Sequence, residues 1–266
     1  HIWARRVTEV INLLYQLKVD LKRGLLSWRF LGAILLCTTV YMLGALPEKG
    51  SGDILYILDA SVAFSSFTEL FPVAAVLPLG CSMLEDIKSG YSNFILQRAT
   101  IRQYLTIRFL ATAFLGALAT ALGMLLFLAI LPISHPLVLK MKMQDAEPVY
   151  EYMRDLVQKK QWGLYFGFYA LLQGLSGMMW ASVGMVISSI VNSAQLIYLS
   201  VVLSMEVICK ILFSFNLPHV VVLAMGGIDE ASRTAVFYKS GGIFILITMI
   251  CFMGFYFLQN RRLRHV

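Results

Sequence analysis

Six long apolar runs limit what this chain can fold into more than any other feature of its sequence. Each run is long enough to cross the hydrocarbon core of a bilayer, which takes about 20 residues of α-helix. No water is present in that core, so a spanning segment must satisfy its own backbone hydrogen bonds. None of the runs alternates with the period of two that is typical of a barrel strand. The predicted spans are 27–46, 60–83, 105–131, 162–189, 194–216 and 240–258.

The composition agrees with a membrane protein, because 59% of the residues are hydrophobic and only 14% are charged. Soluble domains are closer to half apolar and a quarter charged. We therefore predict an all-α membrane protein with six transmembrane helices. Its predicted parts are a cytoplasmic amphipathic helix at 1–25, a transmembrane domain at 26–258 and a basic cytoplasmic tail at 259–266.

The distribution of lysine and arginine predicts the orientation of the chain. These residues are concentrated before the first span, between the second and third spans, and in the tail "NRRLRHV". Because cytoplasmic loops carry the excess of Lys and Arg, both termini and the 84–108 segment are expected in the cytoplasm. The net charge of +7 is explained by these basic faces beside anionic lipid, so no nucleic-acid partner is expected. We expect a multi-pass protein of the plasma membrane of a bacterial cell.

The segment 1–25 has the pattern of an amphipathic helix. Apolar residues recur at alternating spacings of four and three, which places them on one stripe. A basic helix with tryptophan on its apolar side is typical of the inner membrane surface. The same pattern would also serve for packing on another protein helix. The stripe consists of Trp3, Val7, Val10, Leu14, Leu17 and Leu21.

The second and fifth spans contain residues that are unusual inside a membrane. Pro72 and Pro78 predict a bend in the second span, which serves either for packing or for shaping a path. Glu206 and Lys210 in the fifth span are four residues apart and can pair on one helical face. This pair is either a structural charge that neutralises itself or part of a polar cavity opposite Glu69 in the second span.

Small residues recur every four positions in the third and fourth spans. Thr112, Gly116 and Thr120 form one such stripe, and Gly163 with Gly167 forms a G-x-x-x-G motif. Small side chains let helices approach closely, so these stripes are predicted to be packing faces. The sequence leaves open whether the partner helix belongs to the same chain or to a second copy.

Motifs of catalysis and nucleotide binding are absent from the sequence. There is no P-loop, no H-E-x-x-H and no nucleophile elbow. The cysteines and histidines have no metal-ligand spacing, so neither a disulfide nor a metal site is expected. We expect the chain to be no enzyme and to hold no cofactor of its own.

A charged stretch of about two dozen residues, from Leu84 onward, interrupts the apolar chain between the second and third spans. Its sequence "EDIKSGYSNFILQRATIRQYLTIRFL" predicts a short cytoplasmic amphipathic helix, with Ile87, Tyr91, Phe94 and Ile95 on one face and Gly90 in its middle. Two interpretations follow from the pattern. The helix lies on lipid headgroups, or it docks a cytosolic protein that moves the two adjoining spans.

This stretch resembles the coupling-helix region of ABC-2-type permeases, the membrane subunits of ABC exporters. Family members have an acidic residue, a glycine, a leucine, a Ser/Thr-Arg element and then the third span. Ala99 stands where the family often has proline. The likeness extends to the amphipathic first helix, the six spans and the tight hairpin between the fourth and fifth. The matching residues are Glu85, Gly90, Leu96, Thr100, Arg102 and Tyr104.

The resemblance implies that a separate ATP-binding cassette subunit docks on region 84–104, and that two permease chains, identical or different, pair to enclose the transport route. ATP and Mg would be bound by the partner subunit. The docking residues it implies are Glu85, Asp86, Ile87, Lys88, Gly90, Tyr91, Phe94, Arg98 and Arg102. The route residues it implies, from spans two and five, are Phe64, Phe67, Glu69, Phe71, Met205, Glu206 and Ile208.

The apolar character of these route residues predicts a hydrophobic or amphipathic substrate, such as a lipid, a drug or a peptide. Two other functions remain open from the sequence. One is a sensor or immunity subunit that docks an ATPase without moving substrate. The other is a secondary transporter driven by an ion gradient, although no repeat of broken helices is visible.

Overall fold

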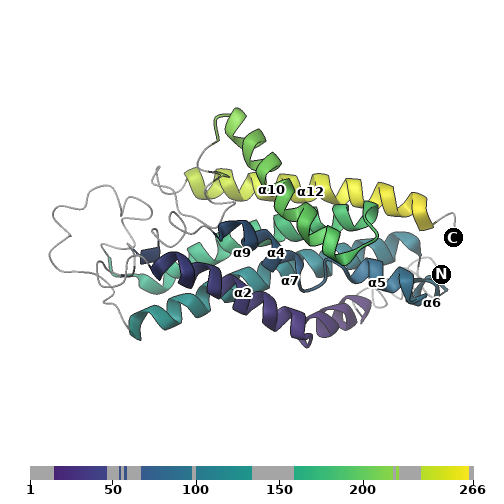
Figure 1. The fold of residues 1–266 in the computed structure, drawn as a ribbon, viewed down its shortest axis with the longest axis horizontal. Helices are drawn as coiled ribbons and strands as arrows, with labels where there is room; N and C mark the ends of the chain where they lie inside the picture. The colour runs from purple at the N-terminus through teal and green to yellow at the C-terminus, as the bar shows by residue number, and fades with distance from the viewer. Residues whose placement is uncertain are drawn as a thin grey trace, which may run out of the picture.

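The computed structural model describes residues 15–46, 54, 57–58, 67–97, 100–133, 159–217, 220–221 and 235–263 (Figure 1). Every regular element in these ranges is a helix. Five helices are long and apolar enough to cross a membrane, so the chain is an all-helical, multi-pass membrane protein. They are α2 (Trp28–Ala45), α7 (Ile101–Ile130), α9 (Trp162–Ile190), α10 (Ala194–Ser214) and α12 (Ala235–Leu263), the last qualifying over Tyr238–Leu263.

The predicted second span, 60–83, is not one continuous helix over residues 67–83. The chain there forms a 3₁₀ turn η2 (Thr68–Leu70), a short helix α4 (Phe71–Val76), a run of turns and then α5 (Ser82–Lys88). Pro72 lies in the first turn of α4, where a missing backbone N–H is tolerated. Pro78 falls among the turns that follow, because it cannot donate the hydrogen bond that a continuing helix needs. The two prolines therefore divide this segment rather than bend one helix.

Helices α7 and α9 pack closely along their length and form the centre of the bundle, with α2 and α4 against them and α12 along α9. A methyl group at Gly177 would lie 2.1 Å from the Thr120 hydroxyl oxygen, so only glycine fits this crossing. The Thr112, Gly116 and Thr120 stripe therefore packs within this chain, which answers that open question for α7. Gly163 and Gly167 meet nothing within 4 Å of where a methyl group would be.

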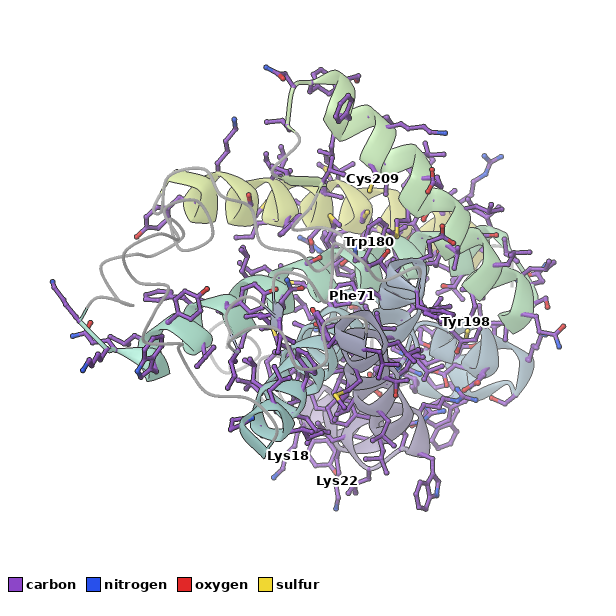
Figure 2. The ribbon with its side chains drawn as sticks, turned by 60° about the vertical axis from the view of Figure 1, so that its left-hand side comes forward. Lys18, Lys22, Phe71, Trp180, Tyr198 and Cys209 are labelled. Atoms are coloured by element: carbon purple, nitrogen blue, oxygen red, sulfur yellow. The ribbon has the colours of Figure 1, made fainter. Side chains whose placement is uncertain are left out.

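Aromatic side chains fill the core beside this crossing. The ring of Tyr41 from α2 stacks on Phe127 from α7 at 5.4 Å. Phe71 of α4 and Trp180 of α9 are fully buried in the same hydrophobic cluster, which Cys209 of α10 also joins (Figure 2). The cluster therefore joins the short α4 to all five of the long helices.

Helix α10 lies at the edge of the bundle and crosses it obliquely (Figure 1). Its exposed side is apolar, with Leu199 and Leu203 more than half exposed. Apolar side chains on the outside of a membrane bundle face lipid or another membrane helix. The buried side consists of Ile197, Val201, Met205, Cys209 and Leu212.

The first helix, residues 15–25, packs on the bundle. Leu17 and Leu21 contact a cluster that includes Leu115 of α7, and a methyl group at Gly24 would lie 2.2 Å from that leucine. Lys18 and Lys22 are exposed and project away from the bundle (Figure 2). The part of the predicted stripe that lies in this helix therefore packs on protein, while Trp3, Val7, Val10 and Leu14 lie outside the described residues.

Candidate functional site at the α5–α6 end

The charged stretch forms two short helices instead of the single helix that the sequence predicts. α5 ends at Lys88, and α6 (Tyr91–Leu96) begins after Gly90, which has a φ of +72°. This left-handed conformation suits glycine, because a side chain would be strained there. The turn at Gly90 divides the predicted apolar face: Ile87 and Ile95 pack against the core, whereas Tyr91 and Phe94 are 39% and 51% exposed.

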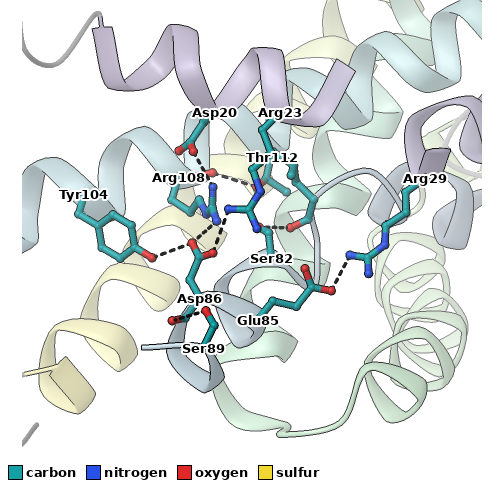
Figure 3. Close-up of polar contacts among 11 residues, drawn as sticks. Asp20, Arg23, Arg29, Ser82, Glu85, Asp86, Ser89, Tyr104, Arg108 and Thr112 are labelled. Atoms are coloured by element: carbon teal, nitrogen blue, oxygen red, sulfur yellow. Dashed lines mark hydrogen bonds and ion pairs between the residues drawn. The ribbon is translucent and has the colours of Figure 1, made fainter. Parts of the chain in front are cut away.

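A capping box fixes the start of α7. The Thr100 hydroxyl accepts a hydrogen bond from the Gln103 amide at 3.3 Å, and the Gln103 side chain accepts from the Thr100 amide at 3.2 Å. Such a reciprocal pair sets the first turn of a helix. Tyr104 and Arg108 follow one turn apart, so both side chains leave the same face of α7. That face is directed at α5 and the first helix (Figure 3).

Five side chains meet there in a buried polar group, which we call the Asp86 cluster (Figure 3). Arg108 donates from one nitrogen to Asp86 and from the other to Asp20 at 2.7 Å. Asp86 also accepts from the Tyr104 hydroxyl at 3.1 Å and from Arg23 at 3.0 Å. The cluster therefore joins the first helix, α5 and α7 through a single carboxylate.

The Asp86 cluster contains two positively charged and two negatively charged side chains. The Arg108 side chain is 0% exposed and that of Asp86 is 1% exposed, and the two arginines cancel the charges of the two aspartates. A buried charge is tolerated only when it is paired and hydrogen-bonded. Burial raises the pKa of Asp20 above its ordinary value of 3.8, although the neighbouring Arg108 acts in the opposite direction. Desolvation therefore outweighs ion pairing at Asp20.

The other carboxylate of α5 is engaged as well. Glu85 pairs with Arg29 in the first turn of α2, with a nitrogen–oxygen distance of 2.6 Å, and both side chains are partly exposed (Figure 3). α5 thus has one ionic contact to the first helix and α7, and another to α2. These contacts cross three separate segments of the chain. A displacement of α5 would act on all of them.

Two hollows flank Tyr91 and Phe94. The first, of about 450 Å³, lies between the first helix and the α6–α7 segment. The second, of about 600 Å³, lies over the turn at Gly90 beside Arg23. The Arg23 guanidinium lies 5.8 Å from the centre of the Tyr91 ring, within the range of a cation–π contact. The first hollow is lined by Tyr15, Gln16, Val19, Asp20, Tyr91, Phe94, Ile95, Tyr104 and Ile107.

The predicted docking residues do not all lie on one surface. Lys88, Gly90, Tyr91 and Phe94 lie on the surface around the two hollows. Asp86, predicted at the rim of a docking surface, is instead buried, because it balances the charge of Arg108. Of the remaining predicted docking residues, Glu85 is half-buried against Arg29, Ile87 is half-buried, Arg102 is exposed but lines neither hollow, and Arg98 lies outside the described residues.

The predicted route residues are not gathered on one surface. Phe71 and Met205 are packed in the core, while Phe67, Glu69 and Glu206 are exposed. Glu206 and Lys210 do pair on one face of α10, at 3.9 Å, as their spacing predicts. Their side chains are 54% and 79% exposed, so the pair lies on the outside of this chain. Ile208 is half-buried, and Phe64 lies outside the described residues.

The sequence did not predict that Arg108 and Asp20 take part in the Asp86 cluster. A usable signal was present at Arg108, which lies two turns inside an apolar helix between Ile107 and Phe109. An arginine in that position needs a carboxylate partner. The partners themselves are 88 and 22 positions away in the chain, so no local spacing identifies them.

No protein-family model matches this chain, and a search of curated proteins finds no match.

Proposed function

We propose that this protein is the membrane subunit of an ATP-driven exporter of the ABC-2 type, docked to a separate ATP-binding cassette subunit at the α5–α6 end. The observation that carries this proposal is the construction of that end. α6 presents Tyr91 and Phe94 to solvent, and the carboxylates of the preceding α5 are fixed to α2, α7 and the first helix. A partner that moves α5 would therefore move the base of the bundle.

The charges at this end support its assignment to the cytoplasm. The exposed ionic side chains around α5, α6 and the last turn of α12 are mostly basic, and basic residues mark the cytoplasmic side of membrane proteins. An ATPase acting in the cytoplasm would find Tyr91 and Phe94 accessible there. Because the chain itself has no P-loop, ATP and Mg are assigned to the partner.

The exposed apolar side of α10 supports pairing with a second permease chain, identical or different, across which substrate would move. Glu206 and Lys210 interrupt that side as a neutral pair. A surface of this kind suits a hydrophobic or amphipathic substrate, such as a lipid, a drug or a peptide. Phe67, Glu69 and Glu206 are the route residues that this arrangement leaves exposed.

The test is purification from native membranes in mild detergent, followed by identification of bound proteins and an assay of ATP hydrolysis. The proposal expects a stoichiometric P-loop ATPase, and its loss in the double variant Tyr91→Ala, Phe94→Ala. Trp28→Ala is the matched control, because Trp28 is an exposed aromatic residue that lines neither hollow. A chain that purifies without an ATPase would contradict the proposal. Transport into vesicles containing the complex would distinguish an exporter from a sensor.

A further inference from the structure

The surface around Tyr91 and Phe94 has an unusual charge pattern, because the acidic residues beside it are paired within the chain. Asp86 is buried against Arg108, and only 13% of the Asp20 side chain is exposed. Glu85 is held by Arg29. None of these three carboxylates is therefore free to bind a cation on another protein without breaking a contact within the chain.

The basic side chains at the same place are exposed. Lys88 is exposed at the end of α5, next to Ser89 and Gly90, which line the second hollow. The Arg23 side chain is 44% exposed and lines that hollow as well. A partner that approaches Tyr91 and Phe94 therefore meets Lys88 and the exposed part of Arg23, which is itself paired with Asp86.

The apolar part of this surface comes from two distant segments. Tyr15 and Val19 of the first helix line the first hollow opposite Tyr91 and Phe94 of α6. Tyr15 is 68% exposed and Val19 is 41% exposed. The first helix thus contributes to the same recess as α6, in addition to packing on α7 through its other face.

We propose that the docking surface consists of the first helix and α6 together, and that the partner contacts it with apolar side chains surrounded by acidic residues. This inference rests on the proposed ATPase docking and specifies the chemistry of the partner. Complementary charges at a rim set orientation and speed association, while apolar side chains in hollows hold the complex. In this arrangement the acidic residues of the partner lie opposite Lys88.

The recesses favour a protein over anionic lipid as the occupant. Among the described residues, no cation lines the first hollow, and Arg23, which lines the second, is already paired with Asp86, so a phosphate headgroup would meet no unpaired cation in either. Apolar side chains of a protein can fill the same space while its acidic residues stay at the rim beside Lys88. The two occupants predict different effects of the same substitutions.

The experiment compares Lys88→Glu with Lys18→Glu in the native-membrane purification. Both lysines are exposed and neither lines a hollow, but Lys88 adjoins Ser89 and Gly90 of the second hollow, whereas Lys18 projects away from the bundle. Lys88→Glu should reduce the retained ATPase about tenfold, because it places like charges opposite each other. Lys18→Glu should retain as much ATPase as the native chain. In a second comparison, Tyr15→Ala should lower retention several-fold, whereas Trp28→Ala should not.

Equal retention by Lys88→Glu and Lys18→Glu would overturn the acidic-rim proposal. If the double variant Tyr91→Ala, Phe94→Ala still released the ATPase in that case, the proposed function would stand without the acidic-rim proposal. Absence of any ATPase from the native preparation would instead defeat the proposed function itself. An ATPase unaffected by Lys88→Glu, together with weaker binding of that variant to vesicles containing phosphatidylglycerol, would assign the surface to anionic lipid.

Discussion

The protein holds two groups of opposite charges in apolar surroundings, and they are built in different ways. The Asp86 cluster joins three helical segments around the buried Arg108 and Asp86, with only Arg23 substantially exposed. The Glu206–Lys210 pair lies on one face of α10, spans 3.9 Å and is exposed on this chain. The first arrangement depends on the tertiary fold, whereas the second needs only the spacing of one helix turn.

This difference determines what each group contributes. Removing one partner from a buried pair leaves an uncompensated charge, which costs about 3–5 kcal/mol. An exposed pair four residues apart on a helix contributes about 0.3–0.5 kcal/mol. The Asp86 cluster should therefore govern the stability of the α5–α6 end, while the pair on α10 should hardly affect the fold of the single chain.

The largest effect is expected from Arg108→Met. It leaves Asp86 and Asp20 without their shared cation and should lower the free energy of unfolding by about 3–5 kcal/mol. Thermal unfolding of the purified protein in detergent measures this loss. Arg102→Met, an exposed arginine in the same helix, is the control and should change stability by about 0.5 kcal/mol or less. Adding Asp86→Asn and Asp20→Asn to Arg108→Met should restore part of the stability, and no recovery would contradict the cluster.

The next largest effect is a difference in stability loss between the two adjacent acidic residues of α5, Glu85 and Asp86. Asp86→Asn should cost about 3 kcal/mol, because Arg108 then keeps only Asp20 as a charged partner. Glu85→Gln should cost about 1 kcal/mol or less, because its pair with Arg29 is partly exposed. Unfolding midpoints of the two variants, measured side by side, give the comparison. Equal losses would mean that burial does not distinguish the two carboxylates.

A smaller, pH-dependent effect is expected at Asp20. Burial raises its pKa, so the neutral form is less disfavoured in the folded state than in the unfolded state. The resulting stabilisation is complete below the ordinary carboxyl pKa and is lost as the pH rises through the raised value. Relative to Asp20→Asn, the native chain should therefore gain stability as the pH falls from about 7 to about 4.

Unfolding curves of the native chain and Asp20→Asn across this pH range give that measurement. Parallel curves would show that Asp20 does not titrate in this way.

The smallest effect is expected from Glu206→Gln. It breaks an exposed pair within one helix and should change the free energy of unfolding by about 0.5 kcal/mol or less. Thermal unfolding of the variant, beside Asp86→Asn, is the measurement. A loss as large as that of Asp86→Asn would show that the pair on α10 is buried against another chain.

The sequence predicted those features that depend on neighbouring residues. The apolar runs predicted the five long helices, and the spacing of Glu206 and Lys210 predicted their contact. Each of these follows from composition or from a helical period within about 30 residues.

Other features depend on contacts between distant segments. Asp86 was predicted to belong to the docking surface, but Arg108 and Arg23 approach it from other helices. The division of the second predicted span also needed tertiary information, since the prolines alone permit either a bend or a break. Ion-pair partners 22, 63 and 88 positions apart cannot be identified from spacing.

The proposed ATPase docking predicts that the first helix, α5 and the start of α7 move as one body when the partner hydrolyses ATP. Spin labels on cysteines introduced at exposed positions test it in the purified complex, after replacement of the four native cysteines. Suitable pairs are Lys18→Cys with Arg102→Cys inside this body, and Arg102→Cys with Leu203→Cys between α7 and α10. The account predicts that ATP changes the second distance and leaves the first unchanged. A change in the first distance, or no change in either, would contradict it.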